Sequence, residues 1–173
     1  MIDRVARALR LATPDLLLVA NDDAAAEWLP GVQRIRDALP GAGGLSGVHA
    51  ALAVAGRPVI VAAWDMPFVS GELLAELARR CAAEDAQAGV AESDSPVGME
   101  PFCACYAPAC LAALEAAVRG GRPGGAEFIR ALDRVAWMSR GETRSFGDPE
   151  RLFFSVNTSA ELSRAEAMNA RAL

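Results

Sequence analysis

The segment VIVAAWDMPF, residues 59–68, decides the fold class of this chain. It begins with an uninterrupted apolar run that stops at Asp65, and Pro67 fixes the turn that follows. A second run of the same kind, Leu16 to Ala20, stops at Asn21. Strands that are buried on both faces have continuous apolar sequences rather than alternating ones. The two runs therefore predict central strands of a parallel sheet.

The rest of the chain alternates between helical and extended periodicity. Helices are predicted near 1–11, 24–29, 48–55, 73–81, 108–118 and 126–132, and a last one opens at Thr158 and Glu161, a capping-box spacing. Further strands are predicted at 32–35, 88–92, 101–106 and 135–138. This order indicates an α/β fold in three layers, with a mostly parallel sheet covered by helices on both faces. We expect a single domain over residues 1–173.

The composition narrows the class of protein. The chain has 173 residues, 53% of them apolar, and a formal net charge of −5. All of its basic residues are arginine, because the sequence contains no lysine. An acidic balance argues against a broad nucleic-acid-binding surface, and no apolar run is long enough to cross a membrane. With no signal-peptide core at the N-terminus either, we expect a cytoplasmic protein with no nucleic-acid or membrane partner.

The cysteines do not form a recognisable metal-binding motif. Cys103 and Cys105 make a C-x-C pair, while Cys81 and Cys110 stand apart and the chain has a single histidine. Zinc sites in proteins use closely spaced pairs of Cys or His ligands. If 101–106 is a strand, the paired sulfurs point to one face as small apolar groups. We therefore predict structural cysteines without a disulfide.

Polar residues follow both apolar runs at the point where each strand ends. Asn21 and Asp65 should project from the same edge of the sheet, and ligands of such sheets bind beyond the carboxyl ends of the strands. The Asp65 carboxylate suits a hard cation such as Mg²⁺ beside a substrate phosphate. Its alternative role is to cap the turn or the next helix. We predict a ligand site at this edge, with Asp65 as its metal ligand.

A glycine-rich loop, Gly41 to Gly47, leads into a predicted helix and offers free backbone amides to an anion. Asp37 lies shortly before this loop, and Asn157 precedes the last helix. Taken singly, each of these features is also explained by an ordinary turn or a solvated surface residue. Their order along the chain is more informative than any one of them.

In that order the motifs resemble the molybdenum cofactor guanylyltransferase family over nearly the whole chain. The most distinctive pieces are Asp65-Met66-Pro67-Phe68 and the G-x-L-x-G loop at Gly43 to Gly47. Pro101 to Tyr106 and Val156-Asn157-Thr158 follow in the family's sequence. Related cytidylyltransferases tend to have another residue where Leu45 stands, so the guanine-using branch is favoured.

The resemblance implies a Rossmann-like nucleotidyltransferase that transfers GMP from GTP to molybdopterin and releases pyrophosphate. It implies nucleotide contacts from Asn21, Asp37, the loop residues Gly44, Leu45 and Gly47, and Asp65. It also implies that Asp65 binds Mg²⁺ and is the catalytic aspartate, and that Asn157 lies near the metal or the acceptor. GTP and molybdopterin are the implied substrates, and molybdoenzyme-assembly proteins are implied partners.

The chain departs from the family at its N-terminus. Family members begin with a buried strand and the loop L-A-G-G-x-S-x-R-M-G-x-x-K, whereas Met1 to Val5 matches the helix that follows this loop. Without that strand, two parallel strands would lack their shared neighbour and expose backbone groups. We expect that the natural protein carries further residues, or that another segment fills the gap. A non-catalytic relative, and a nucleotidyltransferase using CTP or another acceptor, stay open as alternatives.

Overall fold

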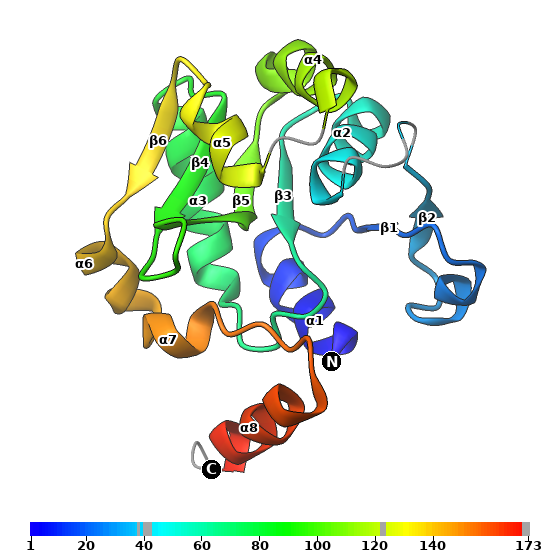
Figure 1. The fold of residues 1–173 in the computed structure, drawn as a ribbon, viewed down its shortest axis with the longest axis vertical. Coiled ribbons are helices and arrows are strands. Elements are labelled where there is room, and N and C mark those ends of the chain that lie inside the picture. Colours follow the sequence, from blue (N-terminus) through cyan, green and yellow to red (C-terminus); the bar gives the residue numbers. More distant parts are fainter. Residues whose placement is uncertain (38, 40–42, 122–123, 171–173) are drawn as a thin grey trace.

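The protein, described by a computed structural model over residues 1–37, 39, 43–121 and 124–170, has the predicted α/β architecture (Figure 1). Its α-helices are α1 (Ile2–Ala12), α2 (Gly44–Ala55), α3 (Gly71–Ala83), α4 (Leu111–Gly121), α5 (Gly125–Arg130), α6 (Arg140–Thr143), α7 (Pro149–Leu152) and α8 (Ser159–Ala170). Its strands are β1 (Leu17–Val19), β2 (Gln33–Ile35), β3 (Val59–Ala62), β4 (Ala88–Glu92), β5 (Met99–Tyr106) and β6 (Val135–Met138). Short 3₁₀ helices cover Asp23–Glu27, Pro108–Cys110 and Arg144–Phe146.

The strands form two sheets. The larger sheet has the order β3-β5-β4-β6, in which β5 is antiparallel to both β3 and β4, while β4 and β6 are parallel. The smaller sheet pairs β1 with β2 in parallel. Within the larger sheet, β3, β4 and β6 share one direction and β5 runs against them. The predicted α/β fold is confirmed, with a larger sheet that is partly parallel because β5 pairs antiparallel with both of its neighbours.

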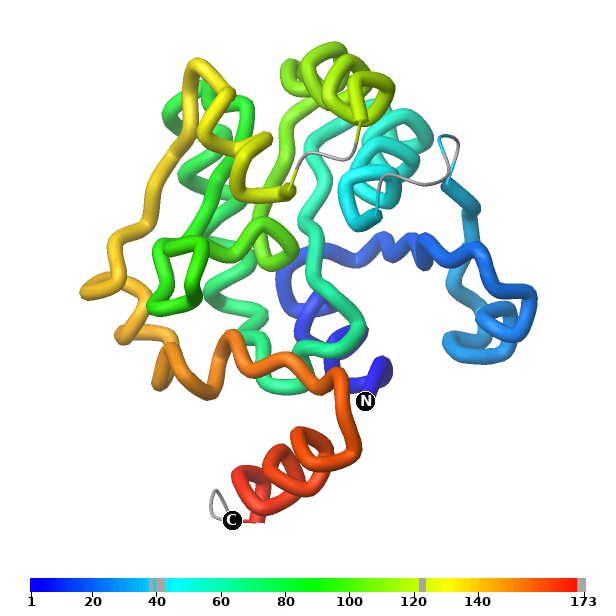
Figure 2. Tube along the Cα trace, in the orientation of Figure 1, coloured from blue at the N-terminus to red at the C-terminus, as the bar shows by residue number. Residues whose placement is uncertain are grey.

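Helices cover both faces of the larger sheet, which confirms the three layers (Figure 2). On one face, α2, α4 and α5 bury a core that includes Leu52, Leu114 and Ile129. On the other face, α1 and α3 bury a second core that includes Val5 and Leu77. No helix in the described part of the chain is long and apolar enough to cross a membrane.

Strand β5 divides its side chains between the two faces, because successive residues of a strand point to opposite sides. Ala104 and Tyr106 pack on the side of α4, whereas Cys103 and Cys105 are buried against α3. The prediction that the paired cysteines share one face as small apolar groups is confirmed. Burial raises the pKa of the Cys103 thiol well above its usual range, so the group is inert in the core.

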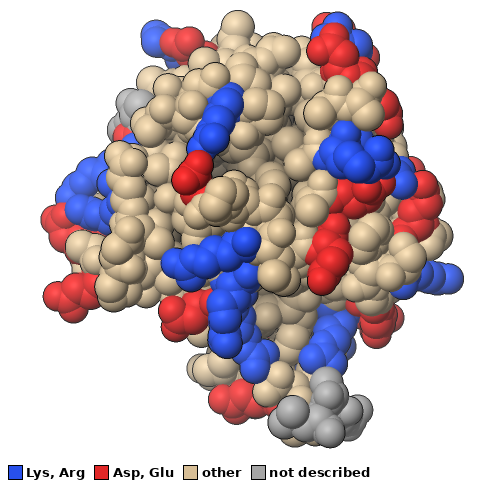
Figure 3. Space-filling view, turned by 180° about the vertical axis from the view of Figure 1, so that it is seen from behind, with Lys and Arg blue, Asp and Glu red and all other residues tan. Residues whose placement is uncertain are grey.

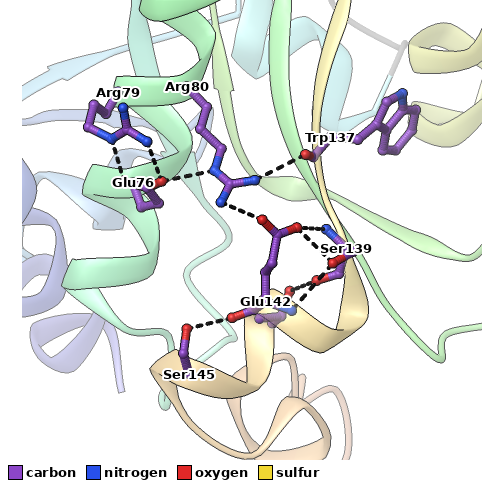
Figure 4. Close-up of polar contacts among 8 residues, drawn as sticks. Glu76, Arg79, Arg80, Trp137, Ser139, Glu142 and Ser145 are labelled. Carbon is purple, nitrogen blue, oxygen red and sulfur yellow. Dashed lines mark hydrogen bonds and ion pairs between the residues drawn. The ribbon is translucent and has the colours of Figure 1, made fainter.

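A polar network ties α3 to the end of β6 (Figure 4). Arg80 donates to Glu76 at 2.9 Å and to Glu142 at 2.8 Å, joining residues 62 positions apart. Glu142 also accepts from the backbone N–H and the hydroxyl of Ser139, which forms a capping box at the start of α6. Elsewhere on the surface, charged groups of both signs are interspersed over the face seen in Figure 3.

Three local expectations differ from the structure. Helix α2 begins at Gly44, four positions before the expected start at 48. The segment expected as a helix at 24–29 is a 3₁₀ turn at Asp23–Glu27, where Asp22 caps the first free amide. The short helices α6 and α7 were not predicted, because each is set by a local cap at Ser139 or Asp148 rather than by an apolar repeat.

The sheet is interrupted between β1 and β3. These strands belong to different sheets, and no hydrogen bond among the described residues joins them. Both strands have only partly buried residues, although their sequences are those of strands buried on both faces. Among the described residues, β1 and β3 therefore have no strand between them.

Candidate functional site

A cavity of about 540 Å³ opens at the gap between β1 and β3. Its walls are the two strands with the polar residues that follow them, one side of α1, and the first turns of α2. Four residues predicted for the site line this one cavity: Asn21, Gly44, Gly47 and Asp65. The structure therefore brings together residues that are up to 44 positions apart in the sequence, at the carboxyl ends of their strands.

Asn21 and Asp37 hold each other at the ends of β1 and β2. The side-chain NH₂ group of Asn21 donates to the Asp37 carboxylate at 3.0 Å. The Asp37 backbone N–H donates to the side-chain oxygen Oδ1 of Asn21 at 3.0 Å. Both polar atoms of the Asn21 side chain are thus engaged. Asp37 does not line the cavity itself; it orients Asn21, which does.

The first turn of α2 approaches the cavity because glycines let it come close. A Cβ on Gly44 would lie 2.5 Å from the Phe102 ring, which excludes a larger residue unless the ring moves. Gly43, just before the helix, has φ of 62°, a conformation that favours glycine. The first amides of this twelve-residue helix have no partner within the helix, and Gly44 and Gly47 of its first turn line the cavity. The earlier part of the predicted loop, 40–42, lies outside the described residues.

Leu45 differs from the other predicted contacts. Its side chain is 1% exposed and packs in the core beneath α4, so it cannot touch a ligand in the cavity. What it offers is its position in the first turn of α2. A contact between Leu45 and a nucleotide would therefore have to come from its backbone rather than from its side chain.

Asp65 is half-buried at the end of β3, where burial raises the pKa of its carboxyl group, helped by the nearby charge of Glu161. Its backbone carbonyl accepts a hydrogen bond from the N–H of Val156 at 2.9 Å. This bond places Asn157, which does not line the cavity, next to the Asp65 turn. The Asn157 N–H donates to Glu161 at 2.8 Å, and this bond is the first cause of the lowered pKa of Glu161.

Three aromatic side chains line the same cavity and were not predicted as site residues. The rings of Trp28 and Trp64 lie 6.0 Å apart at an angle of 39°, and both are substantially exposed. Phe102, on β5, forms part of the wall beside Gly44. The pairing of tryptophans 36 positions apart left no local signal, although two exposed tryptophans after strands are an unusual surface feature.

The described lining of this cavity contains no arginine. An anionic ligand there would depend on the backbone amides of α2 and on a cation held by carboxylate and amide oxygens. No group of three or more His, Cys, Asp and Glu side chains within the described residues could hold a metal alone. A single carboxylate, Asp65, suits Mg²⁺, which proteins bind through one or two carboxylates together with substrate phosphates.

A second cavity, of about 600 Å³, lies at the amino ends of β1 and β2. Two arginines line it: Arg57, which is paired with Asp15 at 2.5 Å, and Arg10. Ligands of open α/β sheets bind at the opposite, carboxyl edge. We therefore assign the candidate site to the cavity that contains Asn21 and Asp65.

Comparison with known proteins shows which family this chain resembles. Residues 1–135 match the family described as the MobA-like NTP transferase domain. The chain is 32% identical over 169 residues to a probable molybdenum cofactor guanylyltransferase of Pelotomaculum thermopropionicum, covering 97% of this chain and 80% of that protein. It is 31% identical over 173 residues to a molybdenum cofactor guanylyltransferase of Desulfosudis oleivorans, covering 96% and 81% of the two chains.

Solved structures share the fold. The molybdopterin-guanine dinucleotide biosynthesis protein A of Archaeoglobus fulgidus superposes with a TM-score of 0.80 at 29% identity, covering 97% of this chain and 86% of that one. A 2-C-methyl-D-erythritol 4-phosphate cytidylyltransferase of Thermus thermophilus superposes with a TM-score of 0.67 at 20% identity, covering 98% and 88%. The second likeness concerns the fold alone.

Proposed function

This chain belongs to the MobA-like NTP transferase family and is a nucleotidyltransferase, and we propose that it transfers GMP from GTP to molybdopterin and releases pyrophosphate. One observation carries the proposal. Asn21, Gly44, Gly47 and Asp65 line a single cavity at the carboxyl ends of the strands, in the chain order of the guanylyltransferase motifs. The names of the relatives in Pelotomaculum and Desulfosudis support the choice of acceptor.

In this proposal, the nucleotide lies across the carboxyl ends of β1 and β3. Asn21, held by Asp37, contacts the base or ribose, and the first turn of α2 presents its amides and glycine backbone to the nucleotide. Asp65 faces the triphosphate, and Asn157 stands on the acceptor side. The acceptor phosphate attacks the α-phosphate in line, and catalysis rests on positioning and charge neutralisation.

The residues at the site fit a divalent cation, which we propose is Mg²⁺. Asp65 offers a hard oxygen ligand, and burial without a positive partner has raised the pKa of its carboxyl group. A cation beside it would favour the ionised form. When bound, the metal would neutralise charge on the phosphates of the nucleotide. Asp65 would hold the cation, with Asn157 close to it.

The test is the affinity for GTP measured by isothermal titration calorimetry, with and without Mg²⁺, in the wild type and in Asp65→Asn. This substitution keeps the size of the side chain and removes its charge. We expect the dependence on Mg²⁺ to disappear in the variant and the affinity with Mg²⁺ to fall by about tenfold or more. Asp133→Asn is the matched control, because Asp133 is exposed before β6, at the amino edge of the sheet.

Three results would count against the proposal. Full Mg²⁺-dependent GTP affinity in Asp65→Asn would remove Asp65 from its role. Tighter binding of CTP than of GTP would move the chain to the cytidine-using enzymes. GTP binding without formation of the dinucleotide from molybdopterin, followed by chromatography, would favour a non-catalytic relative that keeps a partial nucleotide site.

A further inference from the structure

Two tryptophans leave large aromatic surfaces uncovered in the wall of the cavity. Trp28 is 39% exposed and Trp64 is 54% exposed, and both line the cavity. Their ring centroids lie 6.0 Å apart, and the ring planes are inclined by 39°. A tryptophan ring carries a large apolar surface that folded proteins ordinarily cover for the most part. The pair is therefore a surface that a ligand can cover.

Hydrogen bonds fix the backbone that carries Trp28. This residue ends the 3₁₀ turn Asp23–Glu27, and its N–H donates to the Ala25 carbonyl at 3.2 Å. Arg34, on β2, donates to the carbonyl of Asp22 at 2.7 Å and ties the turn to the smaller sheet. The ring is presented from a folded segment, so little conformational entropy is lost there when a ligand binds.

The backbone of Trp64 is fixed in the same way. The Ala63 N–H donates to the Phe102 carbonyl at 2.8 Å, and the Met66 N–H closes a turn on the Ala63 carbonyl at 3.2 Å. Trp64 lies inside this turn, directly before Asp65. The ring is therefore carried by the same turn as the carboxylate that is proposed to hold the cation.

The polar side chains of the cavity are few and largely engaged. Besides the two indole N–H groups, the described lining offers only Asn21, Asp22 and Asp65. Asp37 engages both polar atoms of Asn21, and Asp22 caps the amide of Ala24 at 2.9 Å. An uncharged part of a ligand is therefore held there mainly through its faces. Stacking on an aromatic side chain suits a flat heterocycle, because every such ring has a π-face.

The geometry of the pair gives the two rings different roles. A flat ring inserted between them would need parallel planes about 7 Å apart, twice an ordinary contact distance. The observed tilt and separation exclude this arrangement, so a ligand stacks on the open side of one ring. Trp64 is the more exposed of the two, and Trp28 supports it from the other side.

We propose that Trp64 is the stacking residue for a flat bicyclic heterocycle that contains a 2-amino-4-oxopyrimidine ring, and that Trp28 is its positioning residue. The guanine of GTP and the pterin of molybdopterin both contain this ring. The inference therefore rests on the proposed function and names one chemistry with two sources. A bicyclic ring covers more of the indole than the single ring of cytosine does, so the stack also favours the larger base.

The first experiment is isothermal titration calorimetry of the whole chain in Mg²⁺ with three probes: GTP, neopterin and inorganic tripolyphosphate. We expect Trp64→Leu to weaken the binding of a ring-bearing probe about tenfold and Trp64→Phe to restore most of it. Tripolyphosphate, which has no ring, should bind both variants as it binds the wild type. Trp137→Leu is the matched control, because Trp137 is 40% exposed on β6, at the opposite edge of the larger sheet from β3 (Figure 1).

The probes separate the two sources and the two proposals. A loss confined to GTP assigns the stack to the nucleotide, and a loss confined to neopterin assigns it to the acceptor. If the wild type fails to bind GTP, the proposed function fails, and the neopterin titration decides the inference alone. Unchanged affinity of Trp64→Leu for every ring-bearing probe that the wild type binds would overturn the inference only. Wild-type binding of neither ring would overturn it too, as would a variant that changes only the oligomeric state.

The role of Trp28 is tested in proteins whose one remaining tryptophan is Trp64. Both carry Trp137→Phe; one adds Trp28→Leu, and the other adds Trp28→Phe, which keeps a supporting ring. We expect the Leu protein to show lower fluorescence anisotropy of Trp64 and about threefold weaker binding of the ring-bearing probe than the Phe protein. Equal anisotropy and equal affinity in the two proteins would overturn the positioning role.

Discussion

The contact between α1 and α3 allows a quantitative prediction, because Gly71 is buried where α3 begins against α1. A Cβ at this position would lie 2.6 Å from the Ala8 carbonyl oxygen and 2.7 Å from the Leu11 Cβ. Since an ordinary contact begins at 3.4 Å, Gly71→Ala requires α1 to move away by about 1 Å. This helix forms one wall of the candidate site, so the displacement also reaches the cavity.

The expected cost follows from two opposing effects. Forcing an extra methyl group into a packed contact costs about 1–3 kcal/mol, and the better helix propensity of Ala returns at most about 1 kcal/mol. We expect Gly71→Ala to lower the free energy of unfolding by about 1–2 kcal/mol. In urea denaturation followed by circular dichroism, the midpoint should fall by about 0.5–1 M with an unchanged slope.

Gly120→Ala is the matched control for this substitution. Gly120 lies in α4, and a Cβ there would meet nothing within 4 Å. We expect this variant to be as stable as the wild type or more stable, by up to about 1 kcal/mol. If Gly71→Ala proves no less stable than Gly120→Ala, the packing of α1 against α3 is not as described, and the reasoning is refuted.

Two further predictions concern acid stability and a buried hydrogen bond. Hydrogen bonding to Arg80 lowers the pKa of Glu142 from 4.5 to about 2, so its stabilising effect is complete above pH 4.5 and is lost as the pH falls toward 2. NMR titration should find this low pKa in the wild type and a higher pKa in Arg80→Gln, still below 4.5 because the two hydrogen bonds from Ser139 remain; equal values in both proteins would contradict the assignment. Tyr106→Phe leaves the buried Pro101 carbonyl without its 2.7 Å partner and should cost about 1–3 kcal/mol in urea denaturation. A neutral effect would mean that another donor reaches this carbonyl.

Local patterns predicted most of the elements. The strands at 88–92 and 135–138 have the predicted bounds, and the capping pair of Thr158 and Glu161 starts α8 as expected. The antiparallel direction of β5 was not predicted, although the six residues between β4 and β5 are too few for a parallel crossover. The start of α2 at Gly44 was not predicted, because glycine has poor helix propensity. The tertiary contact with Phe102 overrides this propensity.

The sequence by itself determined the order of most helices and strands, which strand ends carry polar residues and which family the motifs resemble, because burial and capping leave local periodic signals. Only the tertiary structure decided that Asn21 and Asp37 orient each other, that Leu45 is held in the core, and that two tryptophans meet in the wall of the cavity. Only the structure showed that β1 and β3 belong to different sheets and line one cavity. Pairing between strands depends on which distant segments meet, and a one-dimensional pattern of apolar residues is the same whether or not the neighbouring strand is present.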